Sequence, residues 1–408
     1  MDSLREMKDS GVDIVGKIPS NWVIKRLKYV CDIMTGNQDT QDADSYGEYN
    51  FFVRSPIVEK SKKYSFDGEG ILVAGDGAGA GRIFHHAFGK YAVHQRVYIL
   101  HNFYNINSRF LYYFLSNMFP KVMDKGSAQS TVPSIRLPML QNFDLAIPCL
   151  SNQMIIVEYL DSKCSEIDAT SEEIQQQISI LEDYKKSVIT EAVTKGLDPN
   201  VEMKDSGVFY VGPVNAKWKH TKLGYVCTKL QRKFKAEDEA LVCSNKGKVI
   251  VRGEATNGIM TSEDNAMQGI AKGDIAIHGM DTWHGAIAYS EQAGKITRVV
   301  HVCDSRGDNR FIVYWLQSLA FRGVYKLITN GVRGNTSDFR SWDKAAEIFV
   351  PEPDKLEQSE IADYLDSVCE NIDSLISEKK QQLTVLADYK KSLIYEYVTG
   401  KKEVPACE

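Results

Sequence analysis

The 408-residue sequence lacks most features of membrane-spanning, secreted or metal-binding proteins. No stretch approaches about 18 consecutive apolar residues, and the segment MDSLREMKDSG has no apolar core of the kind that a secretion signal needs. Eight cysteines are present, yet no two form a C-x-x-C pair and none lies near histidines at zinc-finger spacing. We therefore expect a cytoplasmic protein with reduced thiols, no bound metal and no membrane contact.

The sequence also lacks the motifs of common nucleic-acid and nucleotide enzymes. It has no N/D-P-P-Y/F tetrapeptide for holding a target amine, no Walker phosphate loop and no convincing P-D…E/D-x-K nuclease pattern. Serine, histidine and aspartate occur without a spacing that implies a catalytic triad. We expect no catalytic residue in this chain.

A glycine-rich run, AGDGAGAG at residues 74–81, is the one segment that favours a nucleotide-binding enzyme instead. Successive glycines let backbone amides approach a phosphate, but such loops are followed by a helix. The residues after this run, up to Leu100, have a β-like pattern. We therefore predict a tight loop between strands, with nucleotide binding as the alternative and a purely structural turn as a third possibility.

What the sequence does contain is an internal duplication. Residues 7–31 return as residues 203–227 with 13 identities over 25 positions, at a constant offset of 196. The strings YLDSKCSEID (159–168) and DYKKS (183–187) return as YLDSVCENID (364–373) and DYKKS (388–392), at an offset of 205. Each copy has a short shared motif, a long variable stretch and a shared helical segment. This order suits a protein that carries two different recognition parts, or readers, on one repeated scaffold.

The shared C-terminal part of each copy has the heptad pattern of a coiled-coil helix about 45 residues long. Each helix would bury only a narrow apolar stripe, so it needs a partner, and the nearest candidate is the other copy in an antiparallel pair. Lys379 interrupts the pattern in the second copy. The predicted seam consists of Leu160, Ile167, Ile174, Leu181, Val188, Leu365, Ile372, Leu386 and Leu393.

The variable parts have the pattern of mixed α/β globular domains. Short β-rich runs occur at 70–75, 91–100, 273–279 and 296–302, and amphipathic helices are predicted at 108–117 and 309–318. The net charge of the chain is −5, but each variable part carries +2, whereas the helical segments carry −5 and −4. Basic charge is thus concentrated in the globular parts, as a phosphate-facing surface requires.

Arginine can bind guanine through two hydrogen bonds, and asparagine or glutamine can bind adenine in the same way. Basic and amide-rich loops therefore supply the candidates for DNA contact, although each such residue could equally be a phosphate contact or a solvated loop residue. In the first globular part the candidates are Arg82, His85, His94, Gln95, Arg96, Ser127, Gln129, Ser130, Thr131 and Arg136. In the second they are Asn245, Arg252, Asn257, His278, Asp281, Trp283, His284, Asn330, Arg333, Asn335 and Arg340.

The string DYKKSVITEAVTKGLDPNVEMKDSGVFYVG at 183–212 closely resembles the central region of the specificity subunits of bacterial type I restriction-modification enzymes. The resemblance extends over the whole chain, in the order of the variable and shared parts. It implies two target recognition domains (1–150 and 198–353), two spacer helices (151–197 and 354–400) and a tail (401–408). The expected fold is a pair of mixed α+β domains separated by two long antiparallel coiled-coil helices, with a pseudo-two-fold repeat.

The resemblance further implies that each domain reads one half of a split site in double-stranded DNA and that the helices set the gap. Partners would be two methyltransferase subunits and restriction and translocation subunits, which use S-adenosylmethionine, ATP and Mg²⁺, with no cofactor in this chain. The alternatives are a methylation-only system, a coiled-coil adaptor without base readout, and a nucleotide-binding enzyme that uses the 74–81 loop.

Overall fold

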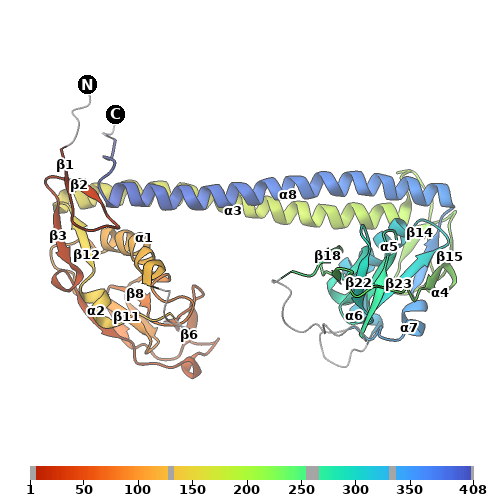
Figure 1. Cartoon of the computed structure of the whole chain (residues 1–408), viewed down its shortest axis with the longest axis horizontal. Helices are drawn as coiled ribbons and strands as arrows, with labels where there is room; N and C mark the ends of the chain where they lie inside the picture. Colours follow the sequence, from red (N-terminus) through yellow and green to blue (C-terminus); the bar gives the residue numbers. More distant parts are fainter. Residues whose placement is uncertain (1–5, 127–132, 254–265, 330–336, 406–408) are drawn as a thin grey trace. The chain divides into compact units, whose positions relative to one another are not determined.

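The computed structural model describes residues 6–126, 133–253, 266–329 and 337–405 (Figure 1). Contacts divide the chain into two compact units. Unit 1 contains residues 1–174 and 381–408, and unit 2 contains residues 175–380. This grouping divides both long helices between the units, so the linear domain boundaries proposed above remain predictions.

Unit 1 contains short sheets and one substantial helix, α1 (Ser108–Gly126). The strand orders are β1-β2, β12-β3, β6-β5-β10-β7 and β4-β11-β8-β9. The strand bounds are β1 Met7–Asp9, β2 Lys17–Pro19, β3 Val23–Arg26, β4 Asp32–Thr35, β5 Tyr49–Phe52, β6 Glu59–Ser61, β7 Phe66–Asp67, β8 Gly70–Ala74, β9 Phe84–Ala87, β10 Lys90–Val93, β11 Val97–His101 and β12 Asp144–Ile147.

Unit 2 repeats this plan around α5 (Asn309–Phe321). Its strand orders are β13-β14, β15-β24, β18-β17-β22-β19 and β16-β23-β20-β21. The strand bounds are β13 Met203–Asp205, β14 Pro213–Asn215, β15 Lys219–Lys222, β16 Cys227–Lys229, β17 Ala240–Cys243, β18 Val249–Val251, β19 Met267–Ile270, β20 Ile275–His278, β21 Ile287–Tyr289, β22 Gly294–Thr297, β23 Val300–Ser305 and β24 Phe349–Glu352.

The two units therefore share a topology, including in the stretches where their sequences diverge. In each unit one four-stranded sheet contains a parallel pair, β5 with β10 and β17 with β22. The prediction of mixed α/β domains in two copies is confirmed. Two of the predicted β-rich runs, 91–100 and 296–302, each span two strands, because the chain turns at His94–Arg96 and at Arg298–Val299.

The core of each unit lies between the α1 or α5 helix, the neighbouring sheet and the repeated N-terminal motif. In unit 1 the repeated Trp22 packs edge-on against Phe110 of α1, with ring centroids 6.4 Å apart. In unit 2 Trp218 packs in the same way against Phe311 of α5, at 6.3 Å. Both tryptophans are buried, so the shared motif is a structural element of the domain.

The two long helices are α3 (Leu150–Lys195) and α8 (Lys355–Val398), as the heptad pattern predicts. Asp354 caps α8 by accepting a 3.0 Å hydrogen bond from the Glu357 backbone N–H. The Glu357 carboxylate accepts from Trp218 Nε1 at 2.9 Å, so this residue ties the helix to the repeated motif of unit 2.

Within each unit, one half of α3 pairs antiparallel with one half of α8 (Figure 1). The predicted seam residues lie on the paired faces. Leu160, Ile167, Ile174, Leu365, Ile372 and Leu393 are buried, and Leu181, Val188 and Leu386 are half-buried. Lys379, which interrupts the pattern, donates a 2.5 Å hydrogen bond to Gln177 of α3. Its ammonium group therefore bonds to the partner helix.

The repeated motifs of the helices bind one another across the pair. In unit 1, Lys390 Nζ of α8 lies 2.6 Å from Asp168 of α3. In unit 2, Lys185 Nζ of α3 lies 2.6 Å from Asp373 of α8. The lysine comes from DYKKS and the aspartate from YLDS…ID in both cases, so the pseudo-two-fold repeat of the sequence is also a repeat of contacts.

A second repeated network anchors each globular part to its long helix. Arg109 Nε and the Tyr113 hydroxyl of α1 donate to Asp161 of α3, at 2.8 and 2.6 Å. In unit 2 an arginine and a tyrosine of α5 donate to Asp366 of α8, both at 2.7 Å. The aspartate of YLDS thus orients the reader domain on the helix.

The unit 2 network gives a stability prediction with a matched control. Asp366→Ala removes the acceptor of the half-buried Tyr314 hydroxyl and should lower the free energy of unfolding by about 2 kcal/mol. Asp363→Ala removes a more exposed partner of Arg310 and should cost less than about 1 kcal/mol. The midpoints of urea unfolding measure both, and equal losses would show that the Tyr314 contact contributes nothing.

Candidate nucleic-acid interface

Three segments of unit 1 that carry candidate residues meet at Gly75. The Gly75 N–H donates to the Arg96 carbonyl at 2.9 Å, and the Ile135 N–H donates to the Gly75 carbonyl at 2.7 Å. A Cβ atom on Gly75 would lie 2.7 Å from the Arg96 carbonyl oxygen, so only glycine allows this approach. The β8–β9 loop, the β10–β11 turn and residues 134–136 therefore form one surface.

The glycine-rich run is the loop between the antiparallel strands β8 and β9, as predicted. Gly77 and Gly81 have φ values of +76° and +65°, in the left-handed region that favours glycine. No helix begins at the end of this loop, so it has no aligned helix N-terminus for a phosphate. The glycines are explained by the backbone geometry of the loop itself.

Asp76, in the middle of this run, holds two arginine side chains. Its Oδ1 accepts from Arg54 NH1 at 2.9 Å, and its Oδ2 accepts from Arg96 NH1 at 3.0 Å. The Asp76 side chain is 17% exposed, whereas those of Arg54 and Arg96 are 43% and 63% exposed. The two guanidinium groups are thus exposed to solvent, whereas the carboxylate that binds them is largely covered.

His94 was among the candidates for DNA contact, but its side chain is only 3% exposed. Burial at this depth is incompatible with a direct base contact in this conformation, so that expectation is corrected. His94 Nδ1 accepts a 3.0 Å hydrogen bond from the Arg96 backbone N–H. Desolvation by burial, followed by the nearby Arg54 charge, lowers the pKa of His94 and favours the neutral ring that this acceptor role needs.

The remaining unit 1 candidates lie around this surface. Arg82 pairs with Asp124 at 2.5 Å, and the exposed Gln95 donates to Asp39 at 3.2 Å. His85 is half-buried against the ring of Phe52, and Arg136 is exposed just before α2 (Leu137–Gln141). The candidates outside the described residues are Ser127, Gln129, Ser130 and Thr131.

Unit 2 builds the same frame from different residues. The Gly279 N–H donates to the Val299 carbonyl at 2.9 Å, and the Phe339 N–H donates to the Gly279 carbonyl at 3.0 Å. These bonds match those at Gly75, so Met280 takes the place of Asp76 and Val299 that of Arg96. The two units therefore present different chemistry from equivalent backbone positions.

The unit 2 candidates divide into supporting and exposed residues. His278 Nδ1 accepts from the Asp281 N–H at 3.1 Å, and Trp283 Nε1 donates to Thr329 Oγ1 at 2.6 Å, so both rings brace the β20–β21 loop. Arg340 NH2 lies 3.0 Å from Met280 Sδ. Asn245, His284 and Arg340 are exposed, and Asp281 and Arg252 are half-buried. The candidates Asn257, Asn330, Arg333 and Asn335 lie outside the described residues.

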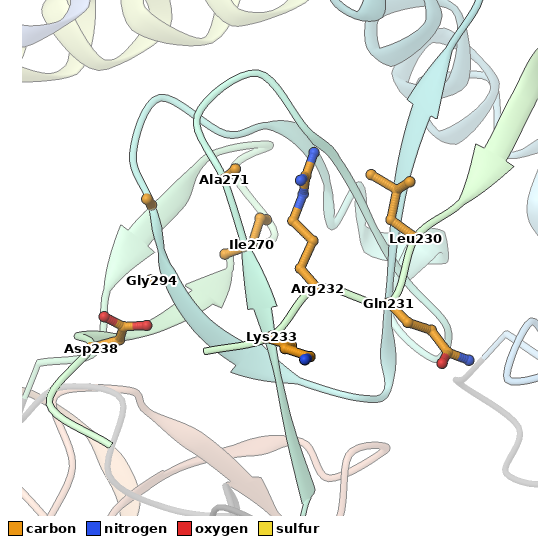
Figure 2. Close-up of a pocket in the computed structure, with 9 residues that line it drawn as sticks. Leu230, Gln231, Arg232, Lys233, Asp238, Ile270, Ala271 and Gly294 are labelled. Carbon is orange, nitrogen blue, oxygen red and sulfur yellow. The ribbon is translucent and has the colours of Figure 1, made fainter. Parts of the chain in front are cut away.

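Unit 2 also has a shallow pocket of about 510 Å³ (Figure 2). It is lined by residues that follow β16 and by the facing ends of β19 and β22, and none of them is a candidate residue. Arg232 in this pocket is bound through Nε and NH2 to the buried Asp274, at 2.6 and 2.7 Å. The charge of Arg232 is therefore neutralised within unit 2.

No cluster of metal-ligating side chains and no helix apolar enough to cross a membrane occurs in the part of the chain that the structure describes. Cys31, Cys164, Cys227 and Cys369, which occupy equivalent positions of the duplication in pairs, are buried. Burial raises the pKa of the Cys31 and Cys227 thiols to about 12, so these side chains act as packing groups.

Comparison with known proteins finds similarity to one family. Residues 19–179 match the model of the type I restriction modification DNA specificity domain. The chain is 30% identical over 178 residues to the EcoDI specificity subunit of Escherichia coli, and the alignment covers 44% of this chain and 39% of that protein. The chain is thus similar, over part of its length in both comparisons, to the specificity subunits of type I restriction enzymes.

A more distant member of the family matches almost from end to end. The MjaVIII specificity subunit of Methanocaldococcus jannaschii is 23% identical over 425 residues, which cover 95% of this chain and 94% of that one. Among solved structures, one described as "Structural basis underlying complex assembly and conformational transition of the type I R-M system" matches with a TM-score of 0.64 at 14% identity. It covers 94% of this chain and 99% of the other, which supports the family fold over the whole length.

Sequence reasoning missed two residues of this specificity-domain surface, Arg54 and Asp76. Asp76 lies inside the glycine-rich run and could have been noticed there as its only charged residue. Arg54 is 22 positions away and reaches Asp76 through the parallel pairing of β5 with β10. Nothing in the local sequence signals that pairing.

The histidines of the chain give a pH prediction. Burial lowers the pKa of His85, His86, His94, His278 and His301, in each case as the largest cause. Below the unfolded histidine pKa of about 6.5 the unfolded chain therefore binds more protons than the folded chain, so stability falls as pH decreases. Urea midpoints should be lower at about pH 5.5 than at about pH 7.5.

The variant His301→Gln tests the cause, because glutamine can still donate to the Phe339 carbonyl but cannot be protonated in this pH range. It should reduce the loss of stability on acidification. The exposed His284→Gln is the matched control and should leave the loss unchanged. An equal loss in the wild type and in His301→Gln would show that this buried histidine does not contribute.

Proposed function

We propose that this chain is a non-catalytic, sequence-specific DNA-binding subunit in which each unit reads one half of a bipartite site in double-stranded DNA. The observation that carries the proposal is the pair of equivalent loop surfaces at Gly75 and Gly279, which share a backbone frame but differ in side chains. One surface presents two arginines on an aspartate, and the other presents methionine and valine at the matching positions. Unlike readers require an asymmetric site.

The gap between the half-sites would be set by the helix pair. Each of α3 and α8 is one continuous helix with residues in both units. In each unit a lysine–aspartate ion pair joins the two helices. A pair of continuous helices would be a suitable spacer, because the length of a helix is fixed by its number of residues. This supports a fixed number of unspecified base pairs between the half-sites.

The partners would be two methyltransferase subunits, one on each unit, with restriction and translocation subunits joining them. Exposed apolar pairs recur at the offset of 205: Ile180 and Tyr184 in unit 2, and Val385 and Tyr389 in unit 1. These side chains are 54–66% exposed at i, i+4 spacing on helices whose seam faces elsewhere. A repeated exposed apolar pair supports one copy of the same partner on each unit.

The chemistry would belong to the partners. S-adenosylmethionine, ATP and Mg²⁺ would be used by the methyltransferase and motor subunits, with none bound by this chain. Titration calorimetry of the isolated chain with S-adenosylmethionine and ATP separates this proposal from a nucleotide-binding enzyme, because we expect no heat of binding. A methylation-only complex without the restriction subunits stays a second candidate, and an adaptor would give no sequence preference.

The spacing role has a direct test. Inserting one matched heptad into both helices, between 174 and 175 and between 380 and 381, keeps the seam and lengthens the pair by about 10 Å. Because DNA rises by about 3.4 Å per base pair, the gap should grow by about three base pairs with both half-sites unchanged. Modified-base sequencing of a host expressing the chain with its methyltransferase subunit measures the change.

The control for this test is the same heptad inserted in the tail, within residues 401–408, which should leave the methylated motif unchanged. A motif in which the half-sites change while the gap stays constant would contradict the spacer role.

The docking faces give a stoichiometry prediction. The double variant Ile180→Ala, Tyr184→Ala should reduce the number of methyltransferase subunits per chain from two to one, because only one face is removed. Native mass spectrometry of the purified complex measures this number. Phe209→Ala is the matched control, since this aromatic side chain is 82% exposed but corresponds to Asp13 in the other copy. Retention of two subunits by the double variant would contradict the assignment.

A further inference from the structure

We propose that Arg96, held by Asp76, reads a guanine in the half-site bound by unit 1. The inference rests on the proposed DNA-reading function and adds the base and the residue that selects it. It is carried by the geometry of the Arg54–Asp76–Arg96 cluster, in which one carboxylate binds two guanidinium groups from different loops.

The side chain of Arg96 is oriented before any ligand arrives. Its NH1 donates to Asp76 Oδ2 at 3.0 Å, while the other oxygen of the same carboxylate is bound by Arg54 at 2.9 Å. A guanidinium group has five N–H donors in a planar fork, so several donors of Arg96 remain for a base edge. An oriented fork loses less conformational entropy on binding than a free one.

The backbone of Arg96 is fixed as well. Its carbonyl accepts from the Gly75 N–H at 2.9 Å, and its N–H donates to Nδ1 of the buried His94 at 3.0 Å. On its other side, His94 Nε2 lies 3.4 Å from Thr40 Oγ1 and 3.6 Å from Asp39 Oδ1. The arginine therefore projects from a braced turn, with His94 as a positioning residue.

Exposure and charge suit a base contact. Arg96 is 63% exposed while Asp76 is 17% exposed, so a ligand meets the guanidinium groups before the carboxylate. Two arginines on one aspartate leave one net positive charge, which favours the electronegative guanine edge with its N7 and O6 acceptors. Adenine presents a donor beside N7, which a second arginine N–H would oppose.

Arg82 shows what a less constrained arginine on the same loop looks like. Its partner Asp124 is 65% exposed, so this ion pair is screened by water, whereas the Asp76 carboxylate is largely covered. A loosely paired arginine suits a phosphate, which accepts hydrogen bonds from many directions. The covered carboxylate therefore distinguishes Arg96 from Arg82, and its greater exposure, 63% against 43%, distinguishes it from Arg54.

Unit 2 has no counterpart of this cluster at the equivalent backbone positions. Met280 replaces Asp76, and Val299 replaces Arg96. The guanine reading should therefore apply to one half-site only, and a change at Arg96 should leave the unit 2 half-site intact.

The test uses the full chain co-expressed with its methyltransferase subunit in a host without other DNA methylation, followed by modified-base sequencing. Arg96→Lys keeps the charge but removes the fork, and Asp76→Asn keeps the shape but removes the charge. Both variants should lose discrimination at one guanine of one half-site by roughly 10-fold or more, with the other half-site unchanged. Arg26→Lys is the control, because Arg26 is exposed and lies 4.0 Å from Asp144 in the β3–β12 pair.

A binding measurement tests whether Arg96 contacts the N7 atom of the guanine. The purified complex should bind a duplex with 7-deazaguanine at that position about 10-fold more weakly than the natural duplex, because the N7 acceptor is missing. For Arg96→Lys the two duplexes should bind with nearly equal affinity.

The outcomes separate the two proposals. Unchanged guanine discrimination in Arg96→Lys, or a wild-type motif without guanine in the half-site that responds to this variant, would overturn the reading by Arg96. Absence of any methylated motif that depends on this chain would instead overturn the DNA-reading function itself.

Discussion

The structure depends on the need of each long helix to bury its heptad seam. A two-position seam on an isolated helix leaves a stripe of leucine and isoleucine in water, and the other copy of the same segment supplies the complementary stripe. Antiparallel pairing then brings the DYKKS lysine of one copy to the YLDS…ID aspartate of the other, as Lys390 with Asp168 and Lys185 with Asp373. The two repeated motifs therefore supply the lysine and the aspartate of one ion pair, and this ion pair is formed twice, once in each unit.

The same helices carry the readers. Asp161 and Asp366, one residue after the seam leucine of YLDS, accept the arginine and tyrosine of α1 and α5. The repeated tryptophan of the N-terminal motif packs on the phenylalanine that follows that arginine. The helix seam, the aspartate network and the packed tryptophan are thus connected, and none of these three features involves the variable loops. This arrangement lets the loop residues change without loss of the frame.

The loops show how a shared backbone carries different chemistry. The Gly75 and Gly279 hydrogen bonds hold three segments together through main-chain atoms, so side chains at the neighbouring positions are free to differ. In unit 1 the space is used by an aspartate with two arginines, and in unit 2 by methionine with a nearby arginine. Some residues with apt chemistry, such as His94 and Trp283, brace these loops through hydrogen bonds within their own unit.

The sequence by itself determined the duplication, the two long helices, their seam and the mixed α/β character of the globular parts. Each of these features produces a local periodic pattern or a repeated string in the sequence. The structure confirmed the fold at these points. Only the tertiary structure decided which loop residues lie together. The Arg54–Asp76–Arg96 cluster depends on pairing between strands far apart in the chain, and burial of His94 depends on segments 36–40 and 52–55 folding over it. Neither leaves a local periodic signal, since such contacts are set by long-range packing.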